Sequence, residues 1–178
     1  MAISGYMYKV KLDCEEDVIL LPFISSWGWA TWKRAWDLNK ESINFLNKLE
    51  GNKNLIYKFN LNGTYPYFEM LRKKNMGSVN SWAIDWYSTV FFNNGLSVFP
   101  RESLVVNIGF DGTGENCKAR SIKQSIPSEI FMAEKFPEKI ETSGYFEYIV
   151  QNFPKASINL ISIFNNAKKR VRRATLKA

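Results

Sequence analysis

The sequence predicts a mixed α/β fold that contains more helix than strand. Short runs of β-branched and aromatic residues, such as residues 18–23, indicate strands, whereas apolar residues recur at helical spacing in longer segments, such as residues 82–92. A chain of 178 residues with 46% hydrophobic and 15% aromatic content can bury one substantial core. We therefore expect one core built from short strands and amphipathic helices.

The expected elements alternate along the chain. Segments rich in β-branched and aromatic residues predict strands at residues 6–10, 18–23, 96–99 and 103–106. Segments with apolar residues at helical spacing predict helices at residues 29–38, 41–49, 67–74 and 82–92. Beyond Arg120 the pattern weakens, and residues 145–171 are expected to form one or two helices interrupted at Pro154.

Glycines mark where the backbone is expected to turn. Asn62-Gly63 predicts a turn within residues 60–66, and Gly95 is expected to end the helix at residues 82–92 in a left-handed conformation. Gly28 would permit a close approach of the backbone ahead of the helix at residues 29–38.

The net charge of +7 is confined to the C-terminal part of the chain. Residues 1–147 hold all 17 acidic residues and 17 of the 24 basic ones, so they are neutral overall. Six of the seven remaining bases follow the apolar residues around 158–164, and clustered bases after an apolar helix attract anionic lipid. An ordinary amphipathic helix with a solvated end explains the same pattern. Because no recognition motif accompanies the charge, nucleic acid is not an expected partner.

Residue types that are absent or scarce exclude several kinds of chemistry. Histidine is missing, so any acid–base catalyst must be a carboxylate and any metal must be held by oxygen ligands. Cys14 and Cys117 form neither a disulfide scaffold nor a metal-type spacing. Neither a signal peptide nor a stretch long enough to span a membrane is recognisable, which predicts a cytoplasmic protein that is at most peripheral on the inner face of the cell membrane.

All six tryptophans fall within two short segments, residues 27–36 and 82–86. The second segment places Trp82 and Trp86 on either side of Asp85. Indole faces beside a carboxylate suit a sugar ring, which stacks through its C–H face while its hydroxyls need polar partners. Core packing explains the same spacing, since buried aromatics are the commoner case.

Three blocks carry a resemblance to a known family: SSWGWATWKRAW (25–36), NSWAIDWYSTVFFNNGLSVFP (80–100) and NIGFDGTGENC (107–117). In this order and spacing they resemble the C-terminal, acceptor-side half of a bacterial GT-A glycosyltransferase. The most similar set is the family 2-like enzymes of surface-polysaccharide biosynthesis. The resemblance implies an acceptor-side part of the Rossmann-like GT-A domain at residues 1–120 and a helical extension with a basic tail at residues 121–178.

The resemblance implies an inverting transfer of a hexosyl or N-acetylhexosaminyl group from a nucleotide sugar to a glycan or lipid-linked acceptor. Asp85 matches the carboxylate that deprotonates the acceptor hydroxyl, although an Asp paired with a base is the alternative reading. We expect the tryptophans of residues 27–36 to lie close to the helix that contains Asp85. The implied substrate-binding residues outside the glycine-rich loop are Trp27, Gly28, Trp29, Trp32, Trp82 and Trp86.

The glycine-rich loop at residues 109–114 is the second site that the resemblance implies. Asp111, Gly112 and Gly114 would let backbone N–H groups approach an anion, although such pairs occur in any turn. Asn116 stands where relatives carry a metal-binding His, and it could contribute only an amide oxygen. The complete enzyme would use Mn²⁺ or Mg²⁺ held by an Asp-x-Asp motif, but this sequence contains no such motif.

The chain therefore resembles a fragment that lacks the donor-binding half. We expect it to be inactive alone and to bind neither nucleotide sugar nor metal tightly. Because half of a sheet would leave an exposed strand edge, we also expect self-association or limited stability. Two other classes of function remain open: a non-catalytic carbohydrate-binding module, which uses the same tryptophans without turnover, and a membrane-docking module, which uses the basic tail.

Overall fold

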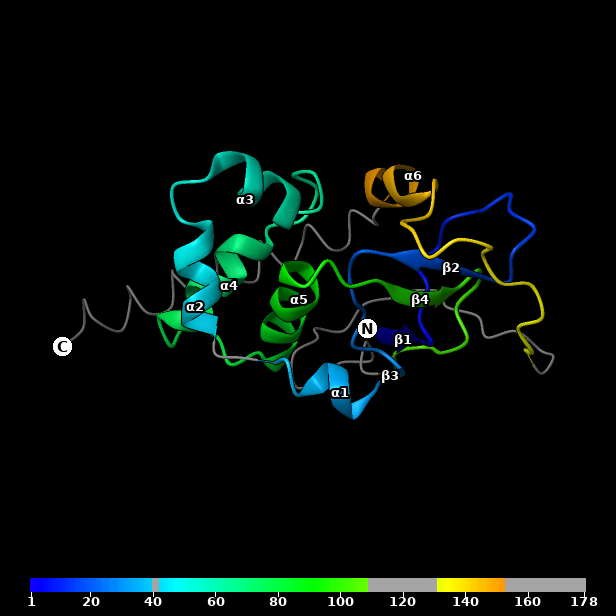
Figure 1. Cartoon of the computed structure of the whole chain (residues 1–178), viewed down its shortest axis with the longest axis horizontal. Coiled ribbons are helices and arrows are strands. Elements are labelled where there is room, and N and C mark those ends of the chain that lie inside the picture. The colour runs from blue at the N-terminus through cyan, green and yellow to red at the C-terminus, as the bar shows by residue number, and fades with distance from the viewer. Residues whose placement is uncertain (40–41, 109–130, 153–178) are drawn as a thin grey trace.

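The computed structural model describes residues 1–39, 42–108 and 131–152, and these form a mixed α/β structure with one small sheet and six helices among the described residues (Figure 1). Along the chain, four elements precede the main helices: strands β1 (Ala2–Ser4), β2 (Val18–Leu21) and β3 (Trp29–Thr31), and the short helix α1 (Lys33–Trp36).

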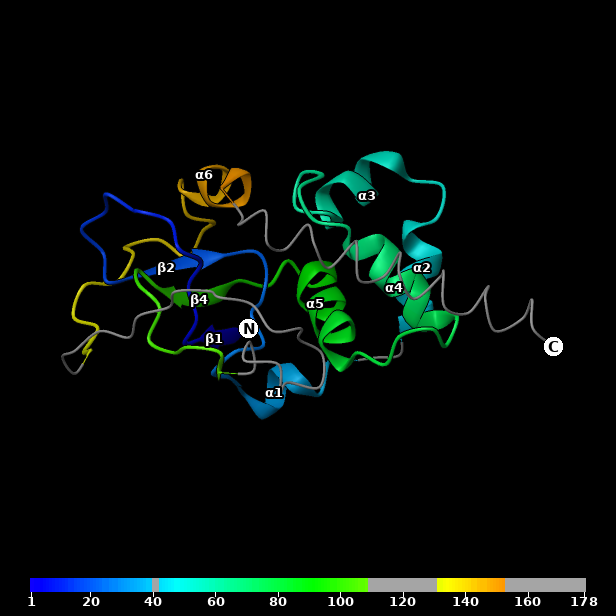
Figure 2. The same ribbon diagram turned by 180° about the vertical axis from the view of Figure 1, so that it is seen from behind.

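Helices α2 (Ser42–Leu49), α3 (Lys53–Phe59), α4 (Tyr67–Asn75) and α5 (Trp82–Phe92) follow without an intervening strand. Strand β4 (Ser97–Pro100) and helix α6 (Phe146–Gln151) complete the described elements. Helix α5 stands between the sheet and helices α2 to α4 in both face-on views (Figures 1 and 2).

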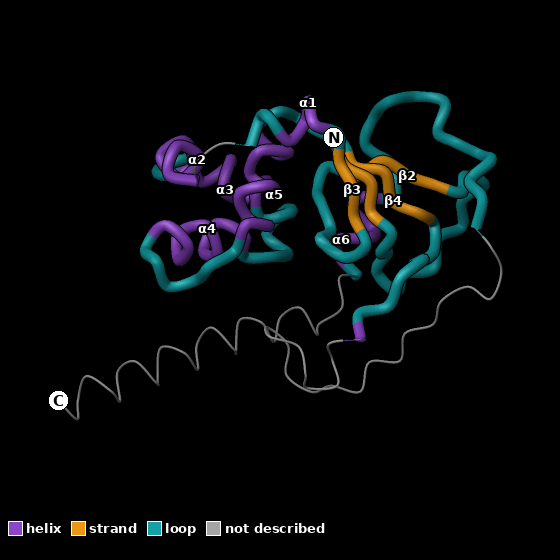
Figure 3. The backbone as a smooth tube through the Cα atoms, turned by 90° about the horizontal axis from the view of Figure 1, so that it is seen from below, coloured by secondary structure: helices purple, strands orange, loops and turns teal. Residues whose placement is uncertain are grey.

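The sheet has the strand order β2-β4-β1-β3. Strand β4 runs antiparallel to β2 and parallel to β1, and β3 runs antiparallel to β1. The tube view shows the four strands on one side of the molecule and helices α2 to α5 on the other, with α6 behind the sheet (Figure 3). Because β1 is a central strand, its Ala2 has partners on both sides, Ser97 in β4 and Thr31 in β3.

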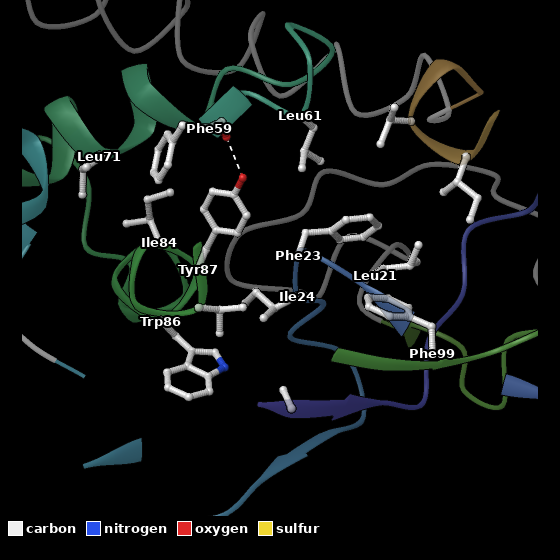
Figure 4. Packing of buried hydrophobic residues seen from close by; sticks show 14 of the residues in the cluster. Leu21, Phe23, Ile24, Phe59, Leu61, Leu71, Ile84, Trp86, Tyr87 and Phe99 are labelled. Atoms are coloured by element: carbon white, nitrogen blue, oxygen red, sulfur yellow. Dashed lines mark hydrogen bonds between the residues drawn. The ribbon is translucent and has the colours of Figure 1, made fainter. Parts of the chain in front are cut away.

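One hydrophobic core joins the sheet to the helices (Figure 4). Phe23 and Phe99 lie on the sheet side, with ring centroids 5.1 Å apart, and both are fully buried. On the helical side Phe59 packs against Tyr87, whose hydroxyl donates a 2.6 Å hydrogen bond to the Phe59 carbonyl oxygen. This bond satisfies a buried hydroxyl and fixes α5 against the end of α3.

Several predicted elements are confirmed. The helix at residues 82–92 has the predicted bounds, and those at 41–49 and 67–74 differ by one residue. The strand at 18–23 ends at Leu21, just before Pro22, which has no N–H to donate. The strand at 96–99 is shifted by one residue. The turn at 60–66 contains positive φ angles at Leu61, Asn62 and Gly63.

Other predicted elements are wrong. Residues 6–10 and 103–106 are not strands: Tyr6 and Tyr8 instead place their rings against Trp27 and Phe23. The predicted helix at 29–38 is a strand followed by one helical turn, because Trp29 to Thr31 pairs with β1. The helix at 53–59 was not predicted.

The end of α5 also differs from the prediction. Asn94, with φ of +48°, adopts the left-handed conformation expected for Gly95. The Gly95 N–H then donates to the Val90 carbonyl oxygen at 2.8 Å, which closes the helix in the Schellman manner. Asparagine is the side chain that tolerates this conformation best after glycine, so the cap moves by one residue.

Within the described ranges, no helix combines the length and the apolar character needed to cross a bilayer. The predicted helices beyond residue 152, the basic tail and the predicted boundary at residue 120 lie outside the described residues.

Candidate functional site

Asp85 lies in the first turn of α5, and its carboxylate forms an ion pair with Lys74 from the last turn of α4. Lys74 Nζ lies 2.5 Å from Asp85 Oδ2, and the two side chains are 23% and 15% exposed. The pair therefore links two helices through charges that are largely shielded from water. The ion pair is the arrangement expected from the alternative in which Asp85 is paired with a base.

The other carboxylate oxygen, Asp85 Oδ1, is in a different environment. It is buried and has no hydrogen-bond partner among the described residues. A buried acceptor without a donor costs free energy, so such atoms are rare in folded proteins. Oδ1 is therefore the atom of the site that an incoming hydroxyl donor would satisfy.

Ser88 and Thr89 follow Asp85 at the spacing of one helix face, but their hydroxyls bond elsewhere. Ser88 Oγ donates to the Ile84 carbonyl oxygen at 2.7 Å. Thr89 Oγ1 lies 2.9 Å from the backbone oxygen of Asp85 and 2.9 Å from Asn39 Oδ1. Lys74 is thus the observed partner of the carboxylate, and the sequence pattern alone did not indicate it.

Four of the six tryptophans contact one another in what we call the tryptophan cluster: Trp29, Trp36, Trp82 and Trp86. Trp29 from β3 stacks on Trp82 from α5, with ring centroids 5.0 Å apart and planes inclined by 25°. The ring centroids of Trp36, from α1, and Trp86, from α5, are 5.3 Å apart. The cluster joins the sheet, α1 and the first turns of α5, so it brings the two tryptophan-bearing segments of the sequence together.

Exposure changes steeply across the tryptophan cluster. Trp86 is fully buried, whereas Trp36 and Trp82 are 39% and 46% exposed. Because large aromatics are usually buried, two half-exposed indoles side by side form an unusual surface. Trp82 is the more exposed of the two indoles, and its ring stacks on Trp29.

Trp86 supports the cluster from inside the protein and has no exposed surface. Figure 4 shows its indole leaving α5 in a different direction from Tyr87. Its Nε1–H is buried and, in the part of the chain that is described, has no acceptor.

Trp27 and Trp32 lie outside the tryptophan cluster. The ring of Trp27 packs edge-on against Tyr6 at 4.4 Å. Trp32 is 40% exposed, and the guanidinium carbon of Arg34 lies 5.2 Å from its ring centroid. The six tryptophans therefore do not form a single ligand-facing surface.

Gly28 has a packing reason for being glycine. Its φ is +55°, and a Cβ built there would lie 2.7 Å from Val105 Cγ1. Its carbonyl oxygen accepts a 2.6 Å hydrogen bond from the Gly5 N–H. The close approach expected at Gly28 is therefore made to the protein's own backbone and to Val105.

The glycine-rich loop residues Asp111, Gly112 and Gly114, and the candidate metal ligand Asn116, lie outside the described residues. Among the residues that are described, no three acidic or cysteine side chains come together as a metal site would require. The described donors therefore do not fit the Mn²⁺ or Mg²⁺ of a complete enzyme, and we derive no step through a metal.

Comparisons with protein families, with curated proteins and with solved structures found no match. The fold and the site thus define a mixed α/β protein that places a partly exposed tryptophan cluster beside an ion-paired carboxylate.

Proposed function

We propose that this chain is the acceptor-side part of an inverting GT-A glycosyltransferase and that it binds the acceptor glycan on the tryptophan cluster. The observation that carries the proposal is the stacked Trp29–Trp82 pair, whose 46% exposed outer indole belongs to the same turn of α5 as Asp85. A sugar stacked on Trp82 would place its hydroxyls beside the first turn of α5, which carries the Asp85 carboxylate, and carbohydrate recognition combines a stacked aromatic ring with polar groups.

Two further observations support this proposal. The blocks at residues 25–36 and 80–100, which resemble the glycosyltransferase family, contact each other through Trp29, Trp36, Trp82 and Trp86. Asp85 Oδ1 is a buried acceptor that lacks a donor among the described residues. In the proposed complex an acceptor hydroxyl supplies that donor.

In the proposed reaction Asp85 accepts the proton of the acceptor hydroxyl. The acceptor oxygen then forms a bond to the anomeric carbon as the bond to the nucleoside diphosphate breaks, and the diphosphate leaves with the electron pair. The donor-binding half of the enzyme would supply the nucleotide sugar. Because Lys74 holds Oδ2 and Oδ1 is buried, the start of α5 must open for the hydroxyl to reach the carboxylate.

The proposal predicts glycan binding that depends on Trp82. Saturation-transfer NMR with neutral hexose and N-acetylhexosamine oligosaccharides should show binding to the folded chain. Trp82→Ala should weaken it about fivefold, because a stacked aromatic contact contributes about 1 kcal/mol. Tyr57→Ala is the matched control, since Tyr57 is 57% exposed on α3, outside the cluster. A folded chain that binds none of these sugars would remove the proposal.

Catalysis needs a separate test with the donor-binding half present. Asp85→Asn should lower the rate about 10²- to 10⁴-fold with donor binding little changed. The chain alone should show negligible binding of nucleoside diphosphate sugars in calorimetry, with or without Mn²⁺. Near-normal turnover of the folded Asp85→Asn enzyme would exclude Asp85 as the base.

A second candidate function is a non-catalytic carbohydrate-binding module. The Lys74–Asp85 ion pair favours it, because a carboxylate held by a cation at 2.5 Å is already satisfied at one oxygen and serves structure. Sugar binding without any turnover in the assembled enzyme would support this function. The basic tail lies outside the described ranges, so its contact with an anionic membrane stays a proposal. A cytoplasmic location also stays a proposal.

A further inference from the structure

Residues 32–38 form an exposed segment at the margin of the molecule, which we call the interfacial segment. It contains α1, which lies at the lower edge of Figure 1 beneath α5 and the sheet. Three large apolar side chains in it are exposed: Trp32 by 40%, Trp36 by 39% and Leu38 by 42%. Ala35 is the member that is buried.

Two consecutive basic residues, Lys33 and Arg34, follow Trp32, and the acidic Asp37 separates Trp36 from Leu38. The guanidinium of Arg34 lies over the ring of Trp32, and Lys33 is 87% exposed in its pair with Asp37. Indole rings accompanied by Lys and Arg are the combination that binds the headgroup layer of a bilayer, where one end of a side chain meets apolar chains and the other meets water.

We propose that the interfacial segment docks the protein on the headgroup layer of a bilayer that contains anionic lipid. Trp32, Trp36 and Leu38 would enter the boundary between headgroups and acyl chains, and Lys33 and Arg34 would contact lipid phosphates. This surface adjoins the proposed glycan site: Trp36 belongs to both, whereas Trp82 and Asp85 take no part in the docking.

Two other occupants fit the segment less well. A two-fold dimer through this surface would bury a segment of seven residues, whereas stable interfaces bury about 20–30 residues on each side. A glycan would need a free indole face, but Arg34 occupies one face of Trp32 at 5.2 Å. A lipid surface meets both features, because its phosphates attract the cations and its acyl boundary accepts the indole edges.

The test uses the full chain with phosphatidylcholine vesicles that contain about 30% phosphatidylglycerol and acyl chains brominated near the headgroups. Bound vesicles should quench tryptophan fluorescence in the wild-type protein. Combined Trp32→Ala and Leu38→Ala substitution should lower vesicle affinity at least about tenfold and reduce the quenched fraction, because two partly exposed apolar side chains are removed. Tyr57→Ala is the control and should change neither quantity.

A second variant keeps the proposal testable if the first fails to fold. Lys33→Gln combined with Arg34→Gln should weaken binding to the anionic vesicles by about fivefold per base and leave binding to pure phosphatidylcholine nearly unchanged. Vesicle binding without quenching would mean that the basic tail alone docks the chain and would overturn the proposal. Concentration-dependent dimerisation abolished by the Trp32→Ala, Leu38→Ala variant would overturn it in favour of a second copy.

Discussion

At the residue scale, the two oxygens of the Asp85 carboxylate have opposite surroundings. Oδ2 lies 2.5 Å from a lysine ammonium, and Oδ1 is buried without a donor among the described residues. Removing the lysine would therefore leave a largely buried carboxylate with no partner, which costs more than the loss of an exposed ion pair.

We predict that Lys74→Met destabilises the protein by about 2 kcal/mol, because it leaves the Asp85 charge unpaired in a site shielded from water. Adding Asp85→Asn should recover part of this loss, since it removes the unpaired charge. The measurement is urea unfolding. Lys33→Met is the matched control: its pair with Asp37 is exposed, 87% and 54%, and should contribute less than about 1 kcal/mol. Equal stability of Lys74→Met and wild type would contradict the prediction.

The sequence indicated Asp85 and the proximity of tryptophans of residues 27–36 to its helix, which Trp29 and Trp36 confirm, but it did not indicate the partner of the carboxylate. Asp85 stood out because it is a carboxylate in an otherwise aromatic helix. Lys74 is one of three consecutive bases in the last turn of α4, and Arg72 and Lys73 differ from it in lying three and four residues after Glu69, with which they pair. Whether Lys74 reaches Asp85 depends on the path of residues 76–81 between α4 and α5, which is a property of the whole helix pair.

At the element scale, the Asp17 side chain holds residues 134–135 beside the start of β2 through hydrogen bonds. Asp17 Oδ2 accepts hydrogen bonds from the N–H groups of Lys135 and Glu134 at 2.9 and 3.0 Å. These bonds, first that of Lys135 and then that of Glu134, hold the pKa of the Asp17 carboxyl below its ordinary value, with Arg101 adding a weaker effect.

The contact should therefore weaken in acid. A carboxyl with a lowered folded-state pKa stabilises the fold above its unfolded pKa of about 4, and this contribution is lost as the pH falls through the folded-state value. Amide-exchange protection of Glu134 and Lys135 should fall over that range, and Asp17→Asn should remove the pH dependence. Asp13→Asn is the control, because the Asp13 contact to the Tyr145 hydroxyl uses its backbone oxygen. Protection independent of pH would exclude the mechanism.

Elements were predicted correctly where the sequence pattern of the segment itself determines them. They were predicted wrongly where pairing with a distant strand determines the structure. Helix α5 has 11 residues whose apolar members recur at helical spacing, so its bounds followed from the pattern alone. Trp29, Trp32 and Trp36 recur at helical spacing, yet Trp29 is in a strand because β1 pairs with it from far along the chain. Residues 6–10 have strand-like composition, but β1 occupies residues 2–4 instead.

At the scale of the whole molecule, buried tyrosines tie the helical side of the core together. Tyr67 stacks on Tyr87 at 4.0 Å and lies 4.5 Å from Tyr65. Burial raises the pKa of Tyr65 to about 12 and raises the pKa values of Tyr67 and Tyr87 well above the ordinary value. Ionising these phenols would place negative charge inside the core.

Stability should therefore decline in alkali. Groups with raised folded-state pKa values stabilise the fold fully below their unfolded pKa of about 10, and this contribution is lost as the pH rises through the folded-state values. Urea unfolding at increasing pH should show falling stability, with tyrosinate absorbance appearing as the protein unfolds. Tyr67→Phe keeps the ring stack but removes one ionisable group, so its decline should be shallower. Stability unchanged in strong alkali would contradict the role of burial.

The strand order has a consequence for synthesis and folding. Ala2 pairs with Ser97, and Val18 pairs with Pro100, so among the described strands only the pair of β1 and β3 can form before residues 97–100 have been synthesised. Contacts between residues so distant in sequence form slowly, because a long loop must close first. Helices α2, α3 and α4 are contiguous and contact one another, so we expect them to assemble early. The tryptophan cluster can assemble only after residues 82–86 have been synthesised, so Trp29, which the pairing of β1 and β3 can place early, must wait for its stacking partner in α5.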